Sequence, residues 1–389
     1  MTFFPRIMSQ PLYLYTMKRI SFFIIGLSAL LFFNGCSTEV DLNADYNSKT
    51  VVYGLLDPRA DIQWIKINKT FLGDGNNLDY ATIRDSSEYR WQEFSRLAVE
   101  MYIDGDYVTE FPLNDTLLSN KEINGIFYGP EQTVYYFQTP LVNGEAQLNE
   151  EATYRLVIDF VERPDVSAET NVVKTTDIGF ISPQPTSTLL MASNQAGNAV
   201  DYKTVNIRFS TGENIKLYDF SLKFNYTEVL NGERDTTSIE YNLGSYKSTT
   251  TGGGMLTDYE YSGLAFFTFL GNRLEAVEGM RREIGVFDGS RTRCFDLRMS
   301  VANEDLATYI EVNSPVTGVI QERPTWSNID NGIGLFASRS SVEVKGIGVT
   351  GAGPNGVTNI GNVKALCIGQ YTNDLGFCDP NPSSDYTCN

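Results

Sequence analysis

The sequence predicts a mainly β protein with one or two helices, and two features lead to this expectation. First, 22 Tyr and 23 Phe accompany many Val, Ile and Thr residues, which are the residue types that favour strands. Second, short strand-like runs recur along the chain, with turn signals containing Gly, Pro, Asn or Asp between them. A length of 389 residues, 42% of them hydrophobic, is enough for two domains that each bury a core.

The first expected strand is residues 51–56, an apolar run that ends at the turn signal Asp57-Pro58-Arg59. Residues 64–71 alternate partly between apolar and polar side chains, which indicates a half-buried strand. A loop rich in Gly and Asn then leads into residues 78–88, where the spacing of apolar side chains predicts a short helix.

A hairpin is predicted next, because Asp104-Gly105 is the residue pair that a type I′ turn prefers. Its two strands are residues 97–103 and 106–111, and two further strands are expected at 134–137 and 154–160. Strands at this spacing predict an N-terminal β-sandwich of immunoglobulin or transthyretin type over residues 51–180.

A Pro- and Ser-rich break at residues 181–187 separates this sandwich from a larger β-rich domain, expected over residues 188–389. In this domain Asn231-Gly232 is a second strong hairpin signal. Residues 264–278 form the one persuasive amphipathic helix, and a second short helix is expected at 303–311 with Asn303 as its N-cap. Strands are expected at 204–210, 218–229, 332–336, 342–344 and 346–349, and a loop at 246–254.

The charge of the chain argues against two kinds of partner, nucleic acid and an anionic lipid surface. The formal net charge is −18, and the first 35 residues hold three cationic residues (Arg6, Lys18 and Arg19) and no acid, so the rest carries −21. No basic patch offsets this charge, so neither nucleic acid nor an anionic lipid surface is an expected partner.

The chain contains no histidine. Its absence excludes Ser-His-Asp and Cys-His nucleophile systems and HExxH zinc sites. Chemistry by a pair of carboxylates remains possible, since it requires only Asp and Glu.

The N-terminal residues resemble a bacterial lipoprotein signal. Met17-Lys18-Arg19 forms a basic start, residues 20–33 form an apolar stretch too short to span a bilayer comfortably, and Phe33-Asn34-Gly35-Cys36 resembles a lipobox. We therefore expect residues 1–35 to be a signal peptide with Met17 as the true initiator, Cys36 to carry lipid, and residues 36–50 to be a tether. The alternative is an ordinary secretory signal with a buried cysteine nearby.

The residue after Cys36 bears on location. In lipoproteins of this kind, a residue other than Asp at this position permits sorting to the outer membrane, and here it is Ser37. The expected location is therefore the outer membrane, on its periplasmic face or on the cell surface. The chain would meet the membrane through its N-terminal lipid.

Four further cysteines, Cys294, Cys367, Cys378 and Cys388, are disulfide candidates in an oxidising compartment and allow three pairings. A local bond between Cys378 and Cys388 across a turn-rich stretch is favoured, which would leave Cys294 to pair with Cys367. The spacing lacks a CxxC motif, so a metal site at the cysteines is not expected.

Few residues stand out as binding candidates. Trp91 lies in a polar stretch and is the best candidate for an exposed aromatic contact. Asp74, Asn76 and Asp79 have the oxygen donors of a calcium loop but lack its full pattern, and a solvated turn explains them better. No cofactor, metal or catalytic residue is predicted.

Three segments carry a family resemblance: residues 51–57 (VVYGLLD), 65–71 (IKINKTF) and 326–336 (WSNIDNGIGLF). With them the chain resembles outer-membrane lipoproteins catalogued as domain of unknown function 4249. The resemblance implies a mostly β fold, no established activity and frequent association with TonB-dependent outer-membrane transporters. None of the three segments is a catalytic motif.

The function predicted from these features is a non-enzymatic, lipid-anchored envelope protein that assists a TonB-dependent transporter or captures its ligand. One alternative is a structural or adhesive surface protein. A third, from the enzyme class, is a glycan hydrolase that uses two carboxylates.

Overall fold

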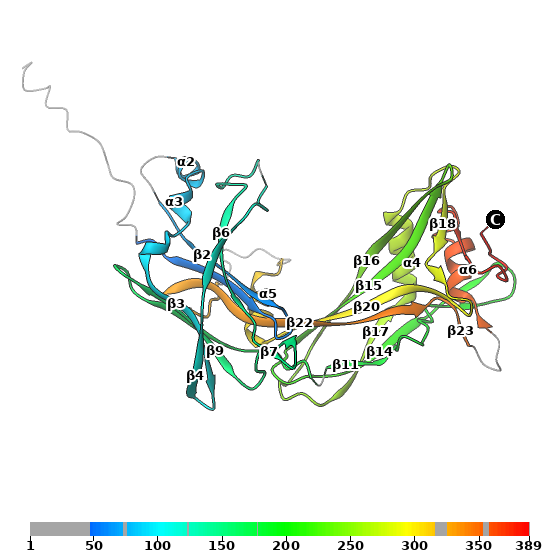
Figure 1. Cartoon of the computed structure of the whole chain (residues 1–389). Helices are drawn as coiled ribbons and strands as arrows, with labels where there is room; N and C mark the ends of the chain where they lie inside the picture. Colours follow the sequence, from blue (N-terminus) through cyan, green and yellow to red (C-terminus); the bar gives the residue numbers. More distant parts are fainter. Residues whose placement is uncertain are drawn as a thin grey trace, which may run out of the picture. The chain divides into compact units, whose positions relative to one another are not determined.

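A computed structural model describes residues 47–72, 76–122, 124–176, 178–315, 325–352 and 358–388 of the chain (Figure 1). The chain divides into two units, Met1–Asn47 and Ser48–Asn389, and the second contains nearly all described residues. Strands far outnumber helices in it, so the predicted mainly β class with few helices is confirmed.

An 11-stranded sheet is the largest element of the fold. Its strands are β1 (Thr50–Leu56), β2 (Ile62–Lys69), β5 (Asn114–Leu118), β6 (Gln132–Gln138), β15 (Leu217–Leu230), β16 (Glu233–Lys247), β18 (Arg281–Ile284), β19 (Val286–Phe287), β20 (Thr292–Ala302), β22 (Gly332–Gly348) and β25 (Phe377–Cys378). Their order is β25-β18-β15-β20-β22-β1-β2-β6-β5, with β16 paired to β15 and β19 paired to β20.

Strand β22 joins the two halves of this sheet (Figure 1). It runs parallel to β1 from Gly332 to Ser338, and antiparallel to β20 from Arg339 to Gly348. The sequence predicted three short strands in this region because Gly and Ser interrupt the apolar pattern. They are one continuous strand, because glycine tolerates the positive φ that it adopts at Gly334 (122°) and Gly346 (67°).

A five-stranded sheet faces β1, β2 and β6 across the first of two hydrophobic cores. Its strands are β3 (Phe94–Ile103), β4 (Asp106–Pro112), β9 (Thr153–Phe160), β10 (Val166–Asn171) and β21 (Ile329–Asp330), in the order β21-β10-β9-β3-β4. Val52, Ile65 and Phe137 from the large sheet pack in one cluster with residues such as Val99 and Leu156 from the five-stranded sheet. Phe111 stacks on Phe137 with ring centroids 5.0 Å apart.

Short helices flank this first core. They are α2 (Asn77–Ala81), α3 (Arg84–Ser87) and the 3₁₀ helix η1 (Trp91–Glu93). The single helix expected at residues 78–88 is therefore two shorter ones, which meet at Thr82 and Ile83.

The second core lies against the other half of the large sheet. Residues of β15 and β20 such as Phe220, Phe224 and Phe295 pack in one cluster with Phe209, Phe266 and Leu366. The elements around it are β11 (Gly179–Ser182), β14 (Thr204–Ser210), β17 (Leu256–Ser262), α4 (Gly263–Arg273) and α6 (Gly361–Ile368). Three short strand pairs complete the fold: β7 (Leu141–Val142) with β8 (Glu145–Ala146), β12 (Ala192–Asn194) with β13 (Val200–Tyr202), and β23 (Gly351–Ala352) with β24 (Thr358–Asn359).

Both predicted hairpin turns are confirmed. Asp104-Gly105 has φ values of 52° and 87°, and Asn231-Gly232 has the same two values, as a type I′ turn requires. The turns join β3 to β4 and β15 to β16.

Along the sequence, the chain passes from the first core to the second close to the predicted break. Val172 belongs to the first core and Val173 to the second. Ile329 and Phe336, from the region expected to form the C-terminal domain, return to the first core. The division of the chain into residues 51–180 and 188–389 itself stays a prediction.

Candidate functional site

A cavity of about 510 Å³ opens on the large sheet beside α5 (Glu304–Asn313). Its lining comes from β15, β16, β20, β22, α5 and the residue that follows β1. The lining residues are Asp57, Leu217, Asp219, Ser245, Arg298, Ser300, Val301, Ala302, Leu306, Ile310, Arg339, Ser340 and Ser341. We call this cavity the polar pocket.

Strand register explains why these side chains gather. Ser245 pairs with Asp219, Asp219 with Ser300, and Ser300 with Ser341, so one polar row crosses four neighbouring strands. Residues directly opposite each other in adjacent strands share a face of the sheet. The alternate residues, such as Phe220 and Met299, point to the other face and are buried in the second core.

Two guanidinium groups and two carboxylates line the polar pocket, so their formal charges balance. Arg298 has one weak ion pair, with its Nη2 3.8 Å from Oε1 of Glu343. Arg339 is exposed, and its side chain makes no ion pair or hydrogen bond with any other residue of the described ranges, although its backbone pairs with Ala302. Its donors are therefore open to a ligand.

The two carboxylates differ in their surroundings. Oδ1 of Asp57 accepts hydrogen bonds from the Ser340 hydroxyl at 2.9 Å and from the Arg59 backbone N–H at 3.1 Å. Burial, reinforced by the charge of Glu240, raises the pKa of the Asp219 carboxyl. Asp219 therefore takes up a proton more readily than an ordinary aspartate, and it donates a hydrogen bond only in that protonated form.

Helix α5 forms the apolar wall of the pocket through Leu306 and Ile310. The predicted N-cap is confirmed, because Asn303 Oδ1 accepts a hydrogen bond from the Leu306 N–H at 3.2 Å. Asn303 also donates to the Thr170 hydroxyl at 2.8 Å, which fixes the start of the helix against β10. The pocket thus combines one apolar wall with converging donors and acceptors, the composition of a site for a small polar ligand.

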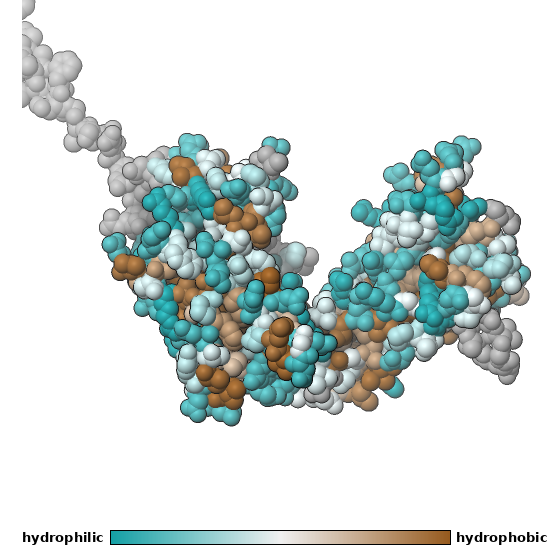
Figure 2. All heavy atoms as spheres, viewed as in Figure 1, coloured by the Kyte–Doolittle hydropathy of each residue, from teal (hydrophilic) through white to brown (hydrophobic). Residues whose placement is uncertain are grey.

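A second cavity, of about 570 Å³, is open and mostly apolar. Val51, Phe71, Ile126 and Phe127 contribute to its lining. Figure 2 shows hydrophilic residues over most of the visible face, with hydrophobic residues in small separate groups. Because the polar pocket gathers charged groups from three strands and from the residue that follows β1, it is the stronger candidate for specific binding.

Trp91, the aromatic residue singled out in the sequence, is half-exposed in η1. Its ring packs on Phe94 and Tyr135, with centroids 6.3 and 6.5 Å away. Tyr135 points into the first core, so Trp91 covers the edge of that core and does not join the polar pocket.

The calcium-loop candidates do not form a metal site in the part of the chain that can be described. Asp74 lies outside the described residues. Asn76 uses its side-chain oxygen to cap α2, accepting from the Leu78 N–H at 3.1 Å, and its amide is 3.4 Å from Oδ1 of Asp79. Among the described residues no group of His, Cys, Asp or Glu could hold a metal ion.

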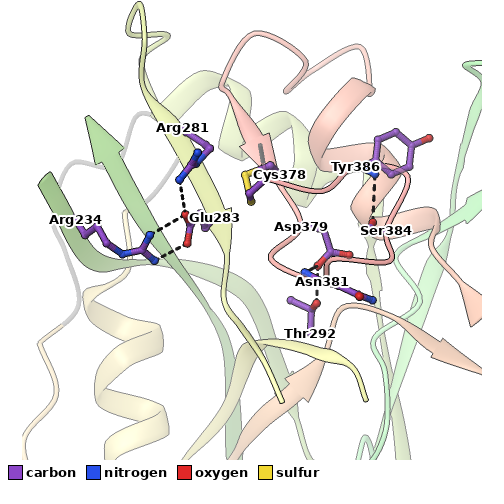
Figure 3. The surroundings of a disulfide bond; sticks show 10 residues. Arg234, Arg281, Glu283, Thr292, Cys378, Asp379, Asn381, Ser384 and Tyr386 are labelled. Atoms are coloured by element: carbon purple, nitrogen blue, oxygen red, sulfur yellow. Dashed lines mark hydrogen bonds and ion pairs between the residues drawn. A yellow bond between two sulfur atoms is a disulfide. The ribbon is translucent and has the colours of Figure 1, made fainter. Parts of the chain in front are cut away.

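The favoured local disulfide is present: Cys378 and Cys388 are bonded at 2.05 Å (Figure 3). Next to it Asp379 accepts hydrogen bonds from the Thr292 hydroxyl at 2.6 Å and from the Asn381 N–H at 3.0 Å (Figure 3). This bond and these contacts hold the C-terminal segment against β20.

The expected second disulfide is wrong, because Cys294 and Cys367 are free thiols. Cys294 is buried in the second core on β20, and Cys367 lies on α6. Burial raises the pKa of the Cys294 thiol well above its usual value and that of Cys367 to about 12. An even number of cysteines does not determine which of them lie close enough in the fold to bond.

The sequence did not reveal the residues of the polar pocket. In the sequence, nothing distinguishes three of these residues from ordinary solvent-facing residues of a strand: Asp219, Arg298 and Arg339. The one available signal is alternation, which places Asp219 and Arg339 on the polar face of their strands.

Cys36, the predicted lipidation site, lies outside the described residues. Within the described residues, no helix has the length and apolar character needed to cross a membrane. The sequence matches no protein-family model and no curated protein. The resemblance to domain of unknown function 4249 therefore stays a prediction.

Proposed function

We propose that this chain is a lipid-anchored, non-enzymatic protein of the outer membrane that captures a small polar ligand for a TonB-dependent transporter. The observation that carries the proposal is the run from Met17 to Cys36, with its basic start, its apolar stretch and its lipobox-like end. The polar pocket supports the capture role, because Arg339, Asp219 and their neighbours lie on a rigid sheet with open donors and acceptors.

The test of the anchor is mass spectrometry of the mature N-terminus, with Cys36→Ser as the variant and Ser37→Ala as its matched control. Lipid is attached through the Cys36 thiol, so we expect a lipidated N-terminal Cys36 in the original chain and in Ser37→Ala. The Cys36→Ser chain should yield no lipidated mature form. An unmodified N-terminus at another residue would overturn the anchor.

The test of the transporter role is affinity purification of the tagged chain from outer membranes in mild detergent. A β-barrel transporter should copurify with the original chain and not with Cys36→Ser, because the lipid holds the body beside its partner. Recovery of no transporter, under conditions that retain a known lipoprotein–transporter pair, would contradict this role.

One observation favours a second candidate function, a glycan hydrolase. Asp57 and Asp219 both line the polar pocket, and the pKa of Asp219 is raised, as a general acid requires. Incubation with oligosaccharides separates the two functions. Turnover that is lost in both Asp219→Asn and Asp57→Asn would favour the hydrolase, whereas binding without turnover favours capture.

A further inference from the structure

Three aromatic side chains lie in a row on successive strands of the large sheet. Trp64 on β2 pairs directly with Tyr136 on β6, and Tyr53 on β1 pairs directly with Lys66 on β2. Lys66 is two residues from Trp64, so all four side chains share one face of the sheet. The alternate residues of these strands, Val52, Ile65 and Phe137, point into the first core.

The rings of this row reach solvent, and they form two close pairs. The exposed fraction is 47% for Tyr53 and 42% for Trp64. The centroids of Trp64 and Tyr136 are 5.3 Å apart, with 42° between the ring planes. Tyr309 of α5 extends the row, with its centroid 6.3 Å from that of Tyr53 and its hydroxyl 3.3 Å from the Tyr53 hydroxyl. We call Tyr53, Trp64, Tyr136 and Tyr309 the aromatic row.

The aromatic row and the polar pocket lie on the same face of the sheet. On β22, Leu335 lies opposite Tyr53 and Ala337 opposite Leu55. Arg339 and Ser341 follow at steps of two residues, so they share that face, and both line the polar pocket. Helix α5 is common to both regions, because Tyr309 belongs to the row and Ile310 to the pocket wall.

The charges in this region favour a neutral ligand. Two arginines and two aspartates balance in the pocket. A net charge of −18 over the whole chain opposes an anionic polymer.

An extended glycan fits these features. The C–H groups on the face of a pyranose ring carry a slight positive charge and pack on the negative face of an aromatic ring. The hydroxyls around the sugar ring need donors and acceptors at the edge of such a platform, and the polar pocket supplies Arg339, Asp57 and Asp219.

We propose that the aromatic row binds a neutral oligosaccharide by stacking on its sugar rings, and that one end of the oligosaccharide enters the polar pocket. The inference rests on the proposed capture function and names the class of its ligand. Because the row spans β1, β2, β6 and α5, several sugar residues of a linear chain can engage at once.

The experiment measures binding by the full chain in detergent micelles, with neutral gluco-, xylo- and manno-oligosaccharides of six sugars as probes and isothermal titration calorimetry as the readout. We expect at least one series to bind, and Trp64→Ala and Tyr53→Ala each to weaken that binding about tenfold or more. Arg339→Ala should weaken it as well, since it removes donors at the pocket end.

Two further variants separate stacking from a general loss of structure. Tyr107→Ala is the matched control, because Tyr107 is 54% exposed on β4 of the five-stranded sheet and lies outside the row. It should bind as the original chain does. Trp64→Phe keeps a ring, so it should retain most of the affinity but lose the change in tryptophan fluorescence that the sugar causes.

The inference is overturned if no neutral oligosaccharide binds at millimolar concentration, or if Trp64→Ala binds as well as Tyr107→Ala does. Binding of peptides in place of sugars would overturn it too. These results leave copurification with a transporter unaffected, so the capture function can stand without the glycan. Glycan binding without a copurifying transporter would support this inference and reject the transporter role.

Discussion

Glu88 follows α3 directly and is a buried carboxylate, with only 3% of its side chain exposed. Its oxygens accept hydrogen bonds from the Thr133 hydroxyl at 2.6 Å and from Arg84 Nε at 3.0 Å. Nζ of Lys66 lies 3.3 Å away. This residue therefore joins α3, β2 and β6 through one charged side chain.

Burial alone would raise the pKa of Glu88, but the hydrogen bonds from Thr133 and Arg84 and the charge of Lys66 outweigh it and lower the pKa. A carboxylate with a lowered pKa stabilises the fold above its unfolded pKa, near 4.5, and this contribution is lost as the pH falls through the folded value. We expect Glu88→Gln to lower the free energy of unfolding by about 3 kcal/mol at pH 7.

Urea unfolding at pH 7 and at acidic pH measures this effect. The difference between Glu88→Gln and the original chain should shrink as the pH falls, because both then carry a neutral side chain. Glu93→Gln is the control: Glu93 pairs with Lys69 at 3.6 Å near the surface, so its loss should cost less than about 1 kcal/mol. A difference that stays constant with pH would show that the charge of Glu88 is not the cause.

Nothing in the sequence marks Glu88 as buried. It stands in the polar stretch Arg84–Arg90, where a carboxylate is ordinarily solvated. Tyr53 is the opposite case: it follows two valines in a run that predicts a buried strand, but its side chain faces solvent. Burial of one residue depends on which strands face it, and that information is not local.

Helix α5 depends on Asn303 at its N-terminus. The side chain caps the helix through the Leu306 N–H and also donates to the Thr170 hydroxyl and to the Asn171 carbonyl. One residue therefore both starts the helix and fixes it to β10. Since α5 carries Tyr309 and Ile310, its position governs both parts of the proposed binding face.

We expect Asn303→Ala to lower the free energy of unfolding by roughly 2–3 kcal/mol, because it removes a cap and leaves buried partners unsatisfied. Ser262→Ala is the matched control, since Ser262 caps α4 through the Ala265 N–H alone, and its loss should cost about 1 kcal/mol. Chemical denaturation of both variants measures the two costs. Equal costs would mean that the contacts of Asn303 to β10 add nothing.

Elements set by local chemistry were predictable from the sequence. Asn303 was identified as a cap, and Asp104-Gly105 and Asn231-Gly232 as turns, since each depends on residues only a few positions apart. Helix α6 was missed, because its apolar residues show no helical periodicity and nearly the whole helix is buried. Strand β17 was missed as well, although Tyr259 and Tyr261 alternate regularly with Asp258 and Glu260.

At the scale of the molecule, β22 is the connection between the two cores. Its first half pairs with β1 and contributes Phe336 to the first core, and its second half contributes Ile347 to the second core. Between them the Ser338 hydroxyl donates to the Leu56 carbonyl at 2.9 Å and accepts from the Val173 N–H at 3.1 Å. The two cores therefore share one strand.

This arrangement could not be predicted from the sequence. The parallel pairing of β1 with β22 joins residues near the start and the end of the described chain, and no local pattern specifies such a partner. The candidate site could not be predicted for the same reason. Only the pairing of strands in this sheet places its residues on one face: Tyr53, Trp64, Asp219 and Arg339.

Gly334 allows the close approach of β22 to β1. Its φ is 122°, and a Cβ built on it would lie 1.9 Å from the Val52 carbonyl oxygen. We expect Gly334→Ala to lower the free energy of unfolding by roughly 3 kcal/mol, because the methyl group adds a clash to an unfavourable backbone conformation. Gly105→Ala is the control: its φ is 87° with no atom within 4 Å, so only a backbone cost of about 1 kcal/mol is expected.

Native-state hydrogen exchange shows whether β22 couples the two cores. If it does, Gly334→Ala should speed the exchange of amides in β1 and also in β20, although β20 lies on the other side of β22. Gly105→Ala should affect the β3–β4 hairpin alone. Faster exchange in β1 with unchanged exchange in β20 would show that the cores open independently.

The aromatic row and the polar pocket would then move apart in such an opening. The row lies over β1, β2 and β6, while most of the pocket lies over β15, β16, β20 and β22.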